Sequence, residues 1–98
     1  MSKIQIYRLQ PKEGQRPQLL SALHALAQGL ASVAGSLGSE LLDAWDGAGP
    51  VIFIERWAND EAHAASSKAL PPTVFKTIMQ SVEGKPEIMG CKPADGSR

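Results

Sequence analysis

The sequence feature that most constrains the fold is the run VIFIERW, from Val51 to Trp57. It is short and rich in β-branched and aromatic residues, which is typical of a strand rather than a helix. Val51, Phe53 and Trp57 alternate with Ile52 and Ile54, so both faces of this strand are apolar. A strand that is apolar on both faces is expected to be buried on both faces. One face should therefore lie under helices, and the other under a layer that a small chain can obtain from a second copy of itself.

The composition narrows the class of protein. The chain has 98 residues, enough for one domain, and its ten Lys and Arg balance its ten Asp and Glu. This balance gives no electrostatic reason to expect binding to nucleic acid or to an anionic membrane. The only cysteine, Cys91, cannot form a disulfide within the chain, which favours a reducing compartment. No stretch resembles a signal peptide or a membrane span, so we expect a cytoplasmic protein.

The remaining stretches alternate between strand and helix patterns. Two apolar stripes at helical spacing are expected: Leu19, Leu23, Leu26, Leu30 and Val33 in the first helix, and a buried stripe of Val74, Phe75, Ile78, Met79 and Val82 in the restarted helix. In the strand over 37–45, Leu37, Leu41 and Trp45 share one face. Gly35 is expected to stop the first helix, Asn59 to cap the second, and Pro71-Pro72 to break the second helical region before it restarts and ends at Gly84. The expected elements are a strand over 3–9, a helix over 18–34, strands over 37–45 and 51–57 joined by a turn over 46–50, a helix over 60–69 that restarts at Pro72, and a strand over 86–92.

This order predicts an α+β fold, the ferredoxin-like βαββαβ arrangement with a four-stranded antiparallel sheet. Right-handed crossovers place both helical regions on one face of such a sheet. The other face would expose an apolar patch larger than monomers usually tolerate, so we expect a homodimer in which two sheets close on each other. Residues 1–92 should form the single domain, and residues 93–98 a frayed tail.

Several stretches resemble the antibiotic biosynthesis monooxygenase (ABM) domain family, and the resemblance covers about residues 3–92. The stretches that carry it are Gly35-x-Leu37-x-x-Glu40-Leu41-Leu42, the strand ending Glu55-Arg56-Trp57, the segment Asn59-Asp60-Glu61-Ala62, the pair Tyr7-Arg8, the turn Pro11–Gly14 and Val74-Phe75-Lys76. The resemblance implies a dimeric α/β barrel with a pocket in each subunit between sheet and helices. Family members oxidise aromatic polyketides or quinols with O2 without a metal or flavin, which implies that no cofactor is needed here.

Such a reaction requires few catalytic groups from the protein. An electron-rich phenolate can itself donate an electron to O2, so the pocket needs to remove a proton and exclude water. It should be apolar with a few polar groups. The resemblance and the strand pattern together predict a small aromatic substrate, catalytic roles for Trp57, Tyr7 and His63, and substrate contacts from Phe75, Met79, Arg56 and Phe53.

Some of these residues also have a structural interpretation. Trp57 could be a core residue, and Trp45 is expected in the core or in a dimer contact. Glu55 and Arg56 point to opposite faces of their strand, so each needs a separate partner. For Arg56 that partner is either a structural carboxylate or an anionic oxygen of the substrate. Many family members carry a histidine where this chain has Ser66, and His63 one turn earlier could replace it or face solvent.

Two further functions stay open. A non-catalytic module that binds a hydrophobic ligand or only dimerises would have a pocket collapsed onto Phe75, Met79 and Trp57. The second of these functions is a different reaction on the same barrel, such as isomerisation or haem breakdown. The haem-degrading branch of the superfamily is characterised by an Asn–Trp–His set, and the corresponding positions of this chain resemble Tyr7, Trp57 and Met79. A methionine that binds haem iron usually does so together with a histidine on the other side, so haem breakdown is the less favoured reaction. Zinc spacings, phosphate loops and nucleophile motifs do not occur, so we expect no metal.

Overall fold

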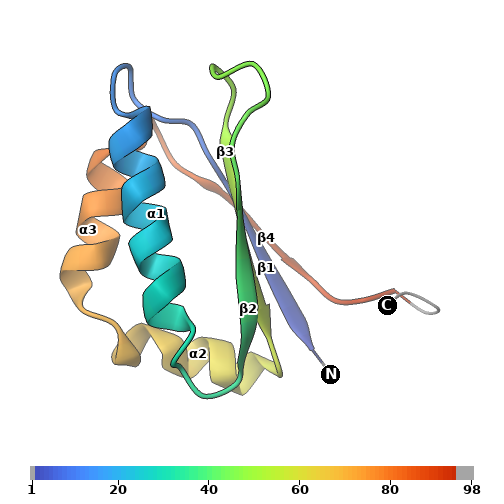
Figure 1. Ribbon diagram of the computed structural model, residues 1–98. Coiled ribbons are helices and arrows are strands. Elements are labelled where there is room, and N and C mark those ends of the chain that lie inside the picture. The colour runs from blue at the N-terminus through green and yellow to red at the C-terminus, as the bar shows by residue number, and fades with distance from the viewer. Residues whose placement is uncertain (1, 95–98) are drawn as a thin grey trace.

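The computed structural model describes residues 2–94, which form a four-stranded antiparallel sheet with helices on one face (Figure 1). The strands lie in the order β2-β3-β1-β4, so the expected ferredoxin-like βαββαβ arrangement is confirmed. The elements are β1 (Lys3–Leu9), α1 (Arg16–Leu30), β2 (Ser36–Leu42), β3 (Val51–Trp57), α2 (Asp60–Ala69), α3 (Pro72–Gln80) and β4 (Glu87–Cys91).

Strand β3 lies inside the sheet, between β1 and β2. Its residues Val51, Phe53 and Trp57 face the helices and are almost completely buried, whereas Ile52 and Ile54 on the opposite face are partly exposed. The predicted division of this strand into two apolar faces is therefore correct. Residues 2–94 cover only one of these two faces.

Helix α1 supplies most of the helical side of the core. Leu19, Leu23, Leu26 and Leu30 recur at helical spacing and are at most 5% exposed, as the apolar stripe predicts. The predicted bounds of 18–34 differ from the observed ones at both ends, since the helix begins at Arg16 and ends at Leu30. After Leu30 the chain continues through tight turns, in which the Val33 N–H donates to the Leu30 carbonyl and the Ser36 N–H to the Val33 carbonyl.

Gly35 ends these turns at a close approach between two segments. Its φ of 84° lies in the left-handed region that favours glycine, and a Cβ at this position would overlap the Ala62 methyl group. The Gly35 carbonyl also accepts a hydrogen bond of 2.8 Å from the Ala58 N–H. Gly35 therefore fixes the distance between the start of β2 and helix α2.

Strand β2 is shorter than predicted, because it ends at Leu42 rather than at residue 45. Its pairing with β3 shifts register between Ser36 and Gly38, and Leu37 at the shift is 59% exposed instead of sharing a face with Leu41. Trp45 lies beyond the strand and its side chain is fully exposed, so the expectation of a core tryptophan was wrong. A contact of Trp45 with a second subunit stays a prediction.

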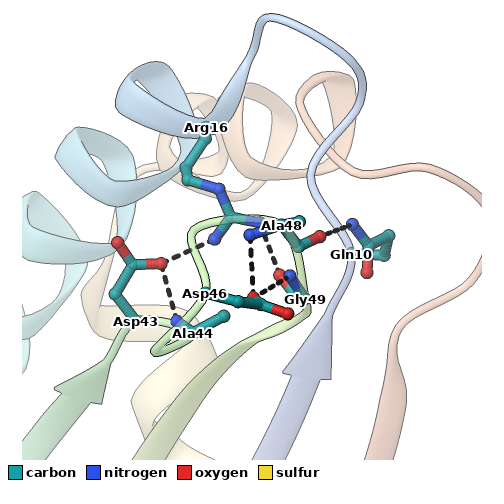
Figure 2. Close-up of polar contacts among 7 residues, drawn as sticks. All are labelled: Gln10, Arg16, Asp43, Ala44, Asp46, Ala48 and Gly49. Atoms are coloured by element: carbon teal, nitrogen blue, oxygen red, sulfur yellow. Dashed lines mark hydrogen bonds and ion pairs between the residues drawn. The ribbon is translucent and has the colours of Figure 1, made fainter.

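The loop between β2 and β3 is held by hydrogen bonds to the start of α1 and the end of β1 (Figure 2). The Arg16 guanidinium pairs with the Asp43 carboxylate at 2.6 Å and donates to the Gly49 carbonyl. The Gln10 amide donates to the Ala48 carbonyl at 3.1 Å. The Asp43 carboxylate also accepts the Ala44 N–H, which closes β2 at this end.

The second helical region is divided as predicted. The Asn59 side chain accepts the Ala62 N–H at 2.8 Å and caps α2. Pro71 and Pro72 then separate α2 from α3, with Pro72 in the first turn of α3. Val82 is buried as expected, although α3 already ends at Gln80 and Val82 pairs with Pro11 in an isolated bridge.

The C-terminal strand is slightly shorter than its prediction. It was expected over 86–92 and spans Glu87–Cys91. Of the predicted tail, Pro93 and Ala94 are exposed and lie outside any helix or strand. Residues 95–98 lie outside the described part of the chain.

The face of the sheet opposite the helices carries no covering element within residues 2–94 (Figure 1). Two ion pairs cross this open face, Arg8 to Glu87 at 2.7 Å and Arg56 to Glu40 at 3.5 Å. No described helix is long and apolar enough to cross a bilayer. The strand register places these apolar side chains on the open face: Ile4, Ile6, Leu42, Ile52, Ile54, Met89 and Cys91.

The close approach at Gly35 predicts a large effect of a single methyl group. Gly35→Ala should lower the free energy of unfolding by about 3 kcal/mol, from left-handed strain plus the overlap with Ala62. Gly84→Ala is the matched control, because Gly84 has a φ of 70° and no atom near its missing Cβ. It should lose only about 1 kcal/mol. Urea unfolding of both variants at one protein concentration tests this, and equal losses would contradict the steric argument.

Candidate functional site

A cavity of about 230 Å3 lies between the helix-covered face of the sheet and helices α1 and α3. We call it the apolar cavity. Among the described residues that line it, Tyr7 and Glu55 alone have polar side-chain groups, a hydroxyl and a carboxylate. Its apolar walls are Leu9, Phe53 and Ile88 from the sheet, Leu23 and Leu26 from α1, Phe75, Ile78 and Met79 from α3, and Pro86.

Glu55 brings a carboxylate into this apolar surrounding. It lies in β3 between Phe53 and Trp57 on the face that points to the helices, and its residue is only 5% exposed. Its Oε1 accepts a hydrogen bond from the Tyr7 hydroxyl at 3.3 Å and one from the Trp57 Nε1–H at 3.2 Å. A buried carboxylate needs such donors, because an unpaired charge in an apolar site is very unfavourable.

Burial changes how readily both acidic groups of this cluster ionise. It raises the pKa of Glu55 above the ordinary glutamate value, although the hydrogen bonds from Trp57 and Tyr7 oppose the rise. Burial also raises the pKa of Tyr7, and the neighbouring Glu55 carboxylate raises it further. The Tyr7 phenol therefore keeps its proton at neutral pH and acts as a hydrogen-bond donor, while Glu55 is the group of the two that can exchange a proton.

A second cavity, of about 240 Å3, lies beside the first and has more hydrogen-bonding groups. We call it the polar cavity. His63, Ser66 and Ser67 from α2 line it, together with residues of α1, α3 and the sheet. The Ser66 hydroxyl donates to the His63 carbonyl at 2.6 Å, so it is tied to its own helix.

His63 connects the polar cavity to the tryptophan. Its ring lies against the indole of Trp57, with centroids 5.7 Å apart and the planes tilted by 40°. Burial lowers the pKa of His63 and the Lys3 ammonium lowers it further, while the Asp60 carboxylate opposes this. Lys3 is itself paired with Asp60 at 2.6 Å. A lowered pKa favours the neutral imidazole, which can accept a proton.

The structure brings together most residues that the sequence suggested for the site. Tyr7, Phe53, Phe75 and Met79 line the apolar cavity, and His63 lines the polar one. Trp57 lines neither cavity and reaches them through its hydrogen bond to Glu55. Phe75 and Met79 were expected in a buried stripe, but they are 39% and 50% exposed, because one side of the cavity is open.

Arg56 does not join this group. It points to the open face of the sheet, opposite the cavities, and pairs with Glu40. Within one chain it therefore makes the structural ion pair that was the alternative to a substrate contact.

Glu55 is the site residue that sequence reasoning missed. It was considered only as one half of a structural ion pair, and its hydrogen bonds to Tyr7 and Trp57 were not foreseen. The alternation of β3 held the signal, because a residue between Phe53 and Trp57 on a buried face must itself be buried. Within residues 2–94, no three histidine, cysteine, aspartate or glutamate side chains gather in a way that could hold a metal ion.

The fold and the cavities define a ferredoxin-like α+β domain with an apolar cavity that is lined by a buried carboxylate. The sequence profile of the antibiotic biosynthesis monooxygenase family matches residues 3–77, which is more than half of the chain. The chain therefore belongs to the antibiotic biosynthesis monooxygenase family, as the resemblance predicted. Among curated proteins, none matches its sequence.

Solved structures of low sequence identity share the fold. Rv0793 from Mycobacterium tuberculosis is 18% identical, with a TM-score of 0.82 and 97% of each chain covered. SnoaB, a cofactor-independent oxygenase from Streptomyces nogalater, is 16% identical with a TM-score of 0.81, covering 95% of this chain and 93% of SnoaB. A putative antibiotic biosynthesis monooxygenase from Chloroflexus aurantiacus is 21% identical with a TM-score of 0.76, covering 96% of this chain and 94% of that chain.

The raised pKa of Glu55 predicts a defined pH dependence of stability. The native state holds this proton to higher pH than the unfolded chain, so ionisation of Glu55 lowers the free energy of unfolding as the pH rises from about 4.3, the ordinary glutamate value. Relative to Glu55→Gln, the unchanged protein should lose stability as the pH rises from the ordinary glutamate value through the raised pKa of Glu55, and should change no further above that pKa. Urea unfolding of both proteins across this range measures the difference.

The control is Glu61→Gln, which removes an exposed negative charge on α2. The pH-dependent change caused by Glu55→Gln should exceed the change caused by this control. A stability difference between Glu55→Gln and the unchanged protein that stays constant with pH would mean that Glu55 ionises equally easily in the native and unfolded states.

Proposed function

We propose that this protein is a cofactor-independent monooxygenase that oxidises a small aromatic or quinol-type compound with O2 in the apolar cavity. The observation that carries the proposal is the Glu55 carboxylate, buried in an apolar cavity and held there by the Tyr7 hydroxyl and the Trp57 indole. Membership of the family and a fold shared with the cofactor-independent oxygenase SnoaB support it.

In this proposal Glu55 accepts the phenolic proton of the substrate. An acceptor with a raised pKa is better matched to a phenol than an ordinary carboxylate is. Tyr7 lines the cavity and donates to the same carboxylate, so it contacts both the substrate and the base. Trp57 is a positioning residue, because it holds Glu55 from outside the cavity. His63, in the polar cavity, is a second proton acceptor.

The phenolate then supplies the electrons that O2 needs. One electron passes to O2, and the resulting superoxide joins the ring radical to form a carbon–oxygen bond. The same carbon loses its hydrogen as a proton, the O–O bond breaks, and hydroxide leaves and takes up a proton to form water. A phenol plus O2 thereby gives a quinone plus water, with one atom of the O2 molecule in each product. The apolar walls keep bulk water away from these intermediates.

Binding of a hydrophobic ligand without turnover is the second candidate function. It is supported by Ser66, which stands where many family members carry a histidine. That alternative was expected to have a pocket collapsed onto Phe75, Met79 and Trp57. The apolar cavity is instead open beside Phe75 and Met79, which favours a ligand in either function.

We also propose that the protein acts as a homodimer joined through the open face of the sheet. Ile6, Ile54 and their apolar neighbours form a patch that a second copy would bury. The pairs Arg8–Glu87 and Arg56–Glu40 lie on the same face and would add polar contacts. In such a dimer Trp45 is available for a contact with the partner.

The oxygenase proposal predicts O2 uptake with hydroquinone-type compounds. The purified protein should consume O2 faster than buffer, and Glu55→Gln should slow the reaction by about 100-fold or more, because general-base catalysis typically contributes that much. Tyr7→Phe and Trp57→Phe should slow it less, since each removes one donor to Glu55. An oxygen electrode measures the rates.

The matched control is Trp45→Phe, which changes a fully exposed tryptophan outside the cavities and should leave the rate unchanged. No enhancement over buffer across the whole panel of phenols and hydroquinones would refute the oxygenase proposal.

The dimer proposal predicts that one charge on the open face disrupts assembly. The unchanged protein should sediment as a dimer, and Ile54→Glu as a folded monomer, because the new carboxylate would be buried without a partner. Gln28→Glu, on an exposed side of α1, should stay dimeric. Sedimentation of the unchanged protein as a monomer at micromolar concentration would show that the open face is not an interface.

A further inference from the structure

The apolar and polar cavities share part of their walls. Tyr7 and Glu55 from the sheet, Leu26 from α1 and Phe75 from α3 line both. Phe75 is 39% exposed and the only residue of α3 that lines both cavities. The two cavities therefore adjoin each other along these four residues, and Phe75 is the partition between them that α3 supplies.

The two cavities have similar volumes. They measure about 230 and about 240 Å3. Pockets that hold drug-sized ligands have volumes of about 300–1,000 Å3. Each cavity alone is below that range, whereas the two together fall inside it. A ligand that fills a volume of this range would therefore occupy both cavities.

The charges around the two cavities limit the chemistry of that ligand. Among the described residues, no lysine or arginine lines either cavity, and the Glu55 carboxylate lines both. The polar cavity offers the His63 imidazole as a hydrogen-bonding group, and the Ser67 hydroxyl, which donates to the Ala64 carbonyl at 3.4 Å, can still accept a hydrogen bond. A carboxylate or phosphate on the ligand would find no cation and would meet Glu55. A neutral group such as a hydroxyl can form hydrogen bonds with these residues without placing an unpaired charge next to Glu55.

We infer that the two cavities form one two-part site, in which an aromatic ring occupies the apolar cavity and an uncharged polar substituent of the same molecule reaches past Phe75 into the polar cavity. This inference rests on the proposed function, because the ring is that of the proposed substrate. It adds that the substrate is an extended, neutral phenol and that Phe75 determines which substituents fit.

The test measures binding under nitrogen, so that oxidation of the ligand plays no part. Isothermal calorimetry compares naphthol, a naphthol with a hydroxypropyl chain and a naphthol with a carboxyethyl chain. The hydroxypropyl compound should bind at least tenfold tighter than the carboxyethyl compound. Ala64→Leu fills the polar cavity and should weaken binding of the hydroxypropyl compound at least tenfold, while binding of plain naphthol changes little.

Ala65→Leu is the matched control, because it adds the same side chain to the next exposed position of α2 and Ala65 lines neither cavity. It should change neither affinity. Phe75→Ala should raise the affinity for a three-ring phenol relative to naphthol, because it removes the partition, and Lys76→Ala should not.

Three outcomes would overturn the two-part site. They are an unchanged affinity of Ala64→Leu for the hydroxypropyl compound, tighter binding of the carboxyethyl compound, and no binding of any of the three naphthols. The oxygenase proposal fails separately, when these ligands bind as expected but O2 is not consumed. O2 uptake with the hydroxypropyl compound at a subsaturating concentration that is insensitive to Ala64→Leu would instead leave the oxygenase proposal intact and refute the two-part site.

Discussion

The burial of one face of β3 under α1 is the constraint on which the rest of the structure depends. Phe53 and Trp57 are almost completely buried in this layer together with the leucines of α1. Glu55 lies between them on the same face, so the packing that stabilises the domain also holds a carboxylate in an apolar surrounding. The core and the candidate site are thus two parts of a single layer. A change that loosens the core would also change how readily Glu55 ionises.

Much of the fold could be predicted because its signals are local. Alternation of apolar residues located β1 and β3, leucine spacing located α1, and Asn59 and Pro72 marked helix starts that the structure confirms. The end of β2 was misplaced because its pattern continues to Trp45. The strand instead ends at Leu42, and the next residue, Asp43, forms an ion pair with Arg16, which is distant in sequence. Such a contact leaves no periodic trace in the sequence.

The site was less predictable than the fold for a similar reason. Tyr7, Phe53, Phe75 and Met79 were expected near the ligand, and they line one cavity. The role of Glu55 depends on the pairing of β1 with β3, which places the Tyr7 hydroxyl within reach of the carboxylate. Arg56 was expected to contact the substrate but does not line the cavities. It follows Glu55 in the strand, so its side chain points to the opposite face of the sheet, where it pairs with Glu40. Side-chain direction within a strand therefore decided which of two adjacent charged residues entered the site.

The contact between Gly35 and Ala62 has a consequence for how this family member could diverge. A methyl group at position 35 would collide with the one at position 62, so the two positions are expected to change together. Any larger side chain at either position would push the first turns of α2 outward. His63 is the next residue along, so its ring would move with that turn. Divergent descendants could in this way reshape the polar cavity through a residue that never touches the ligand.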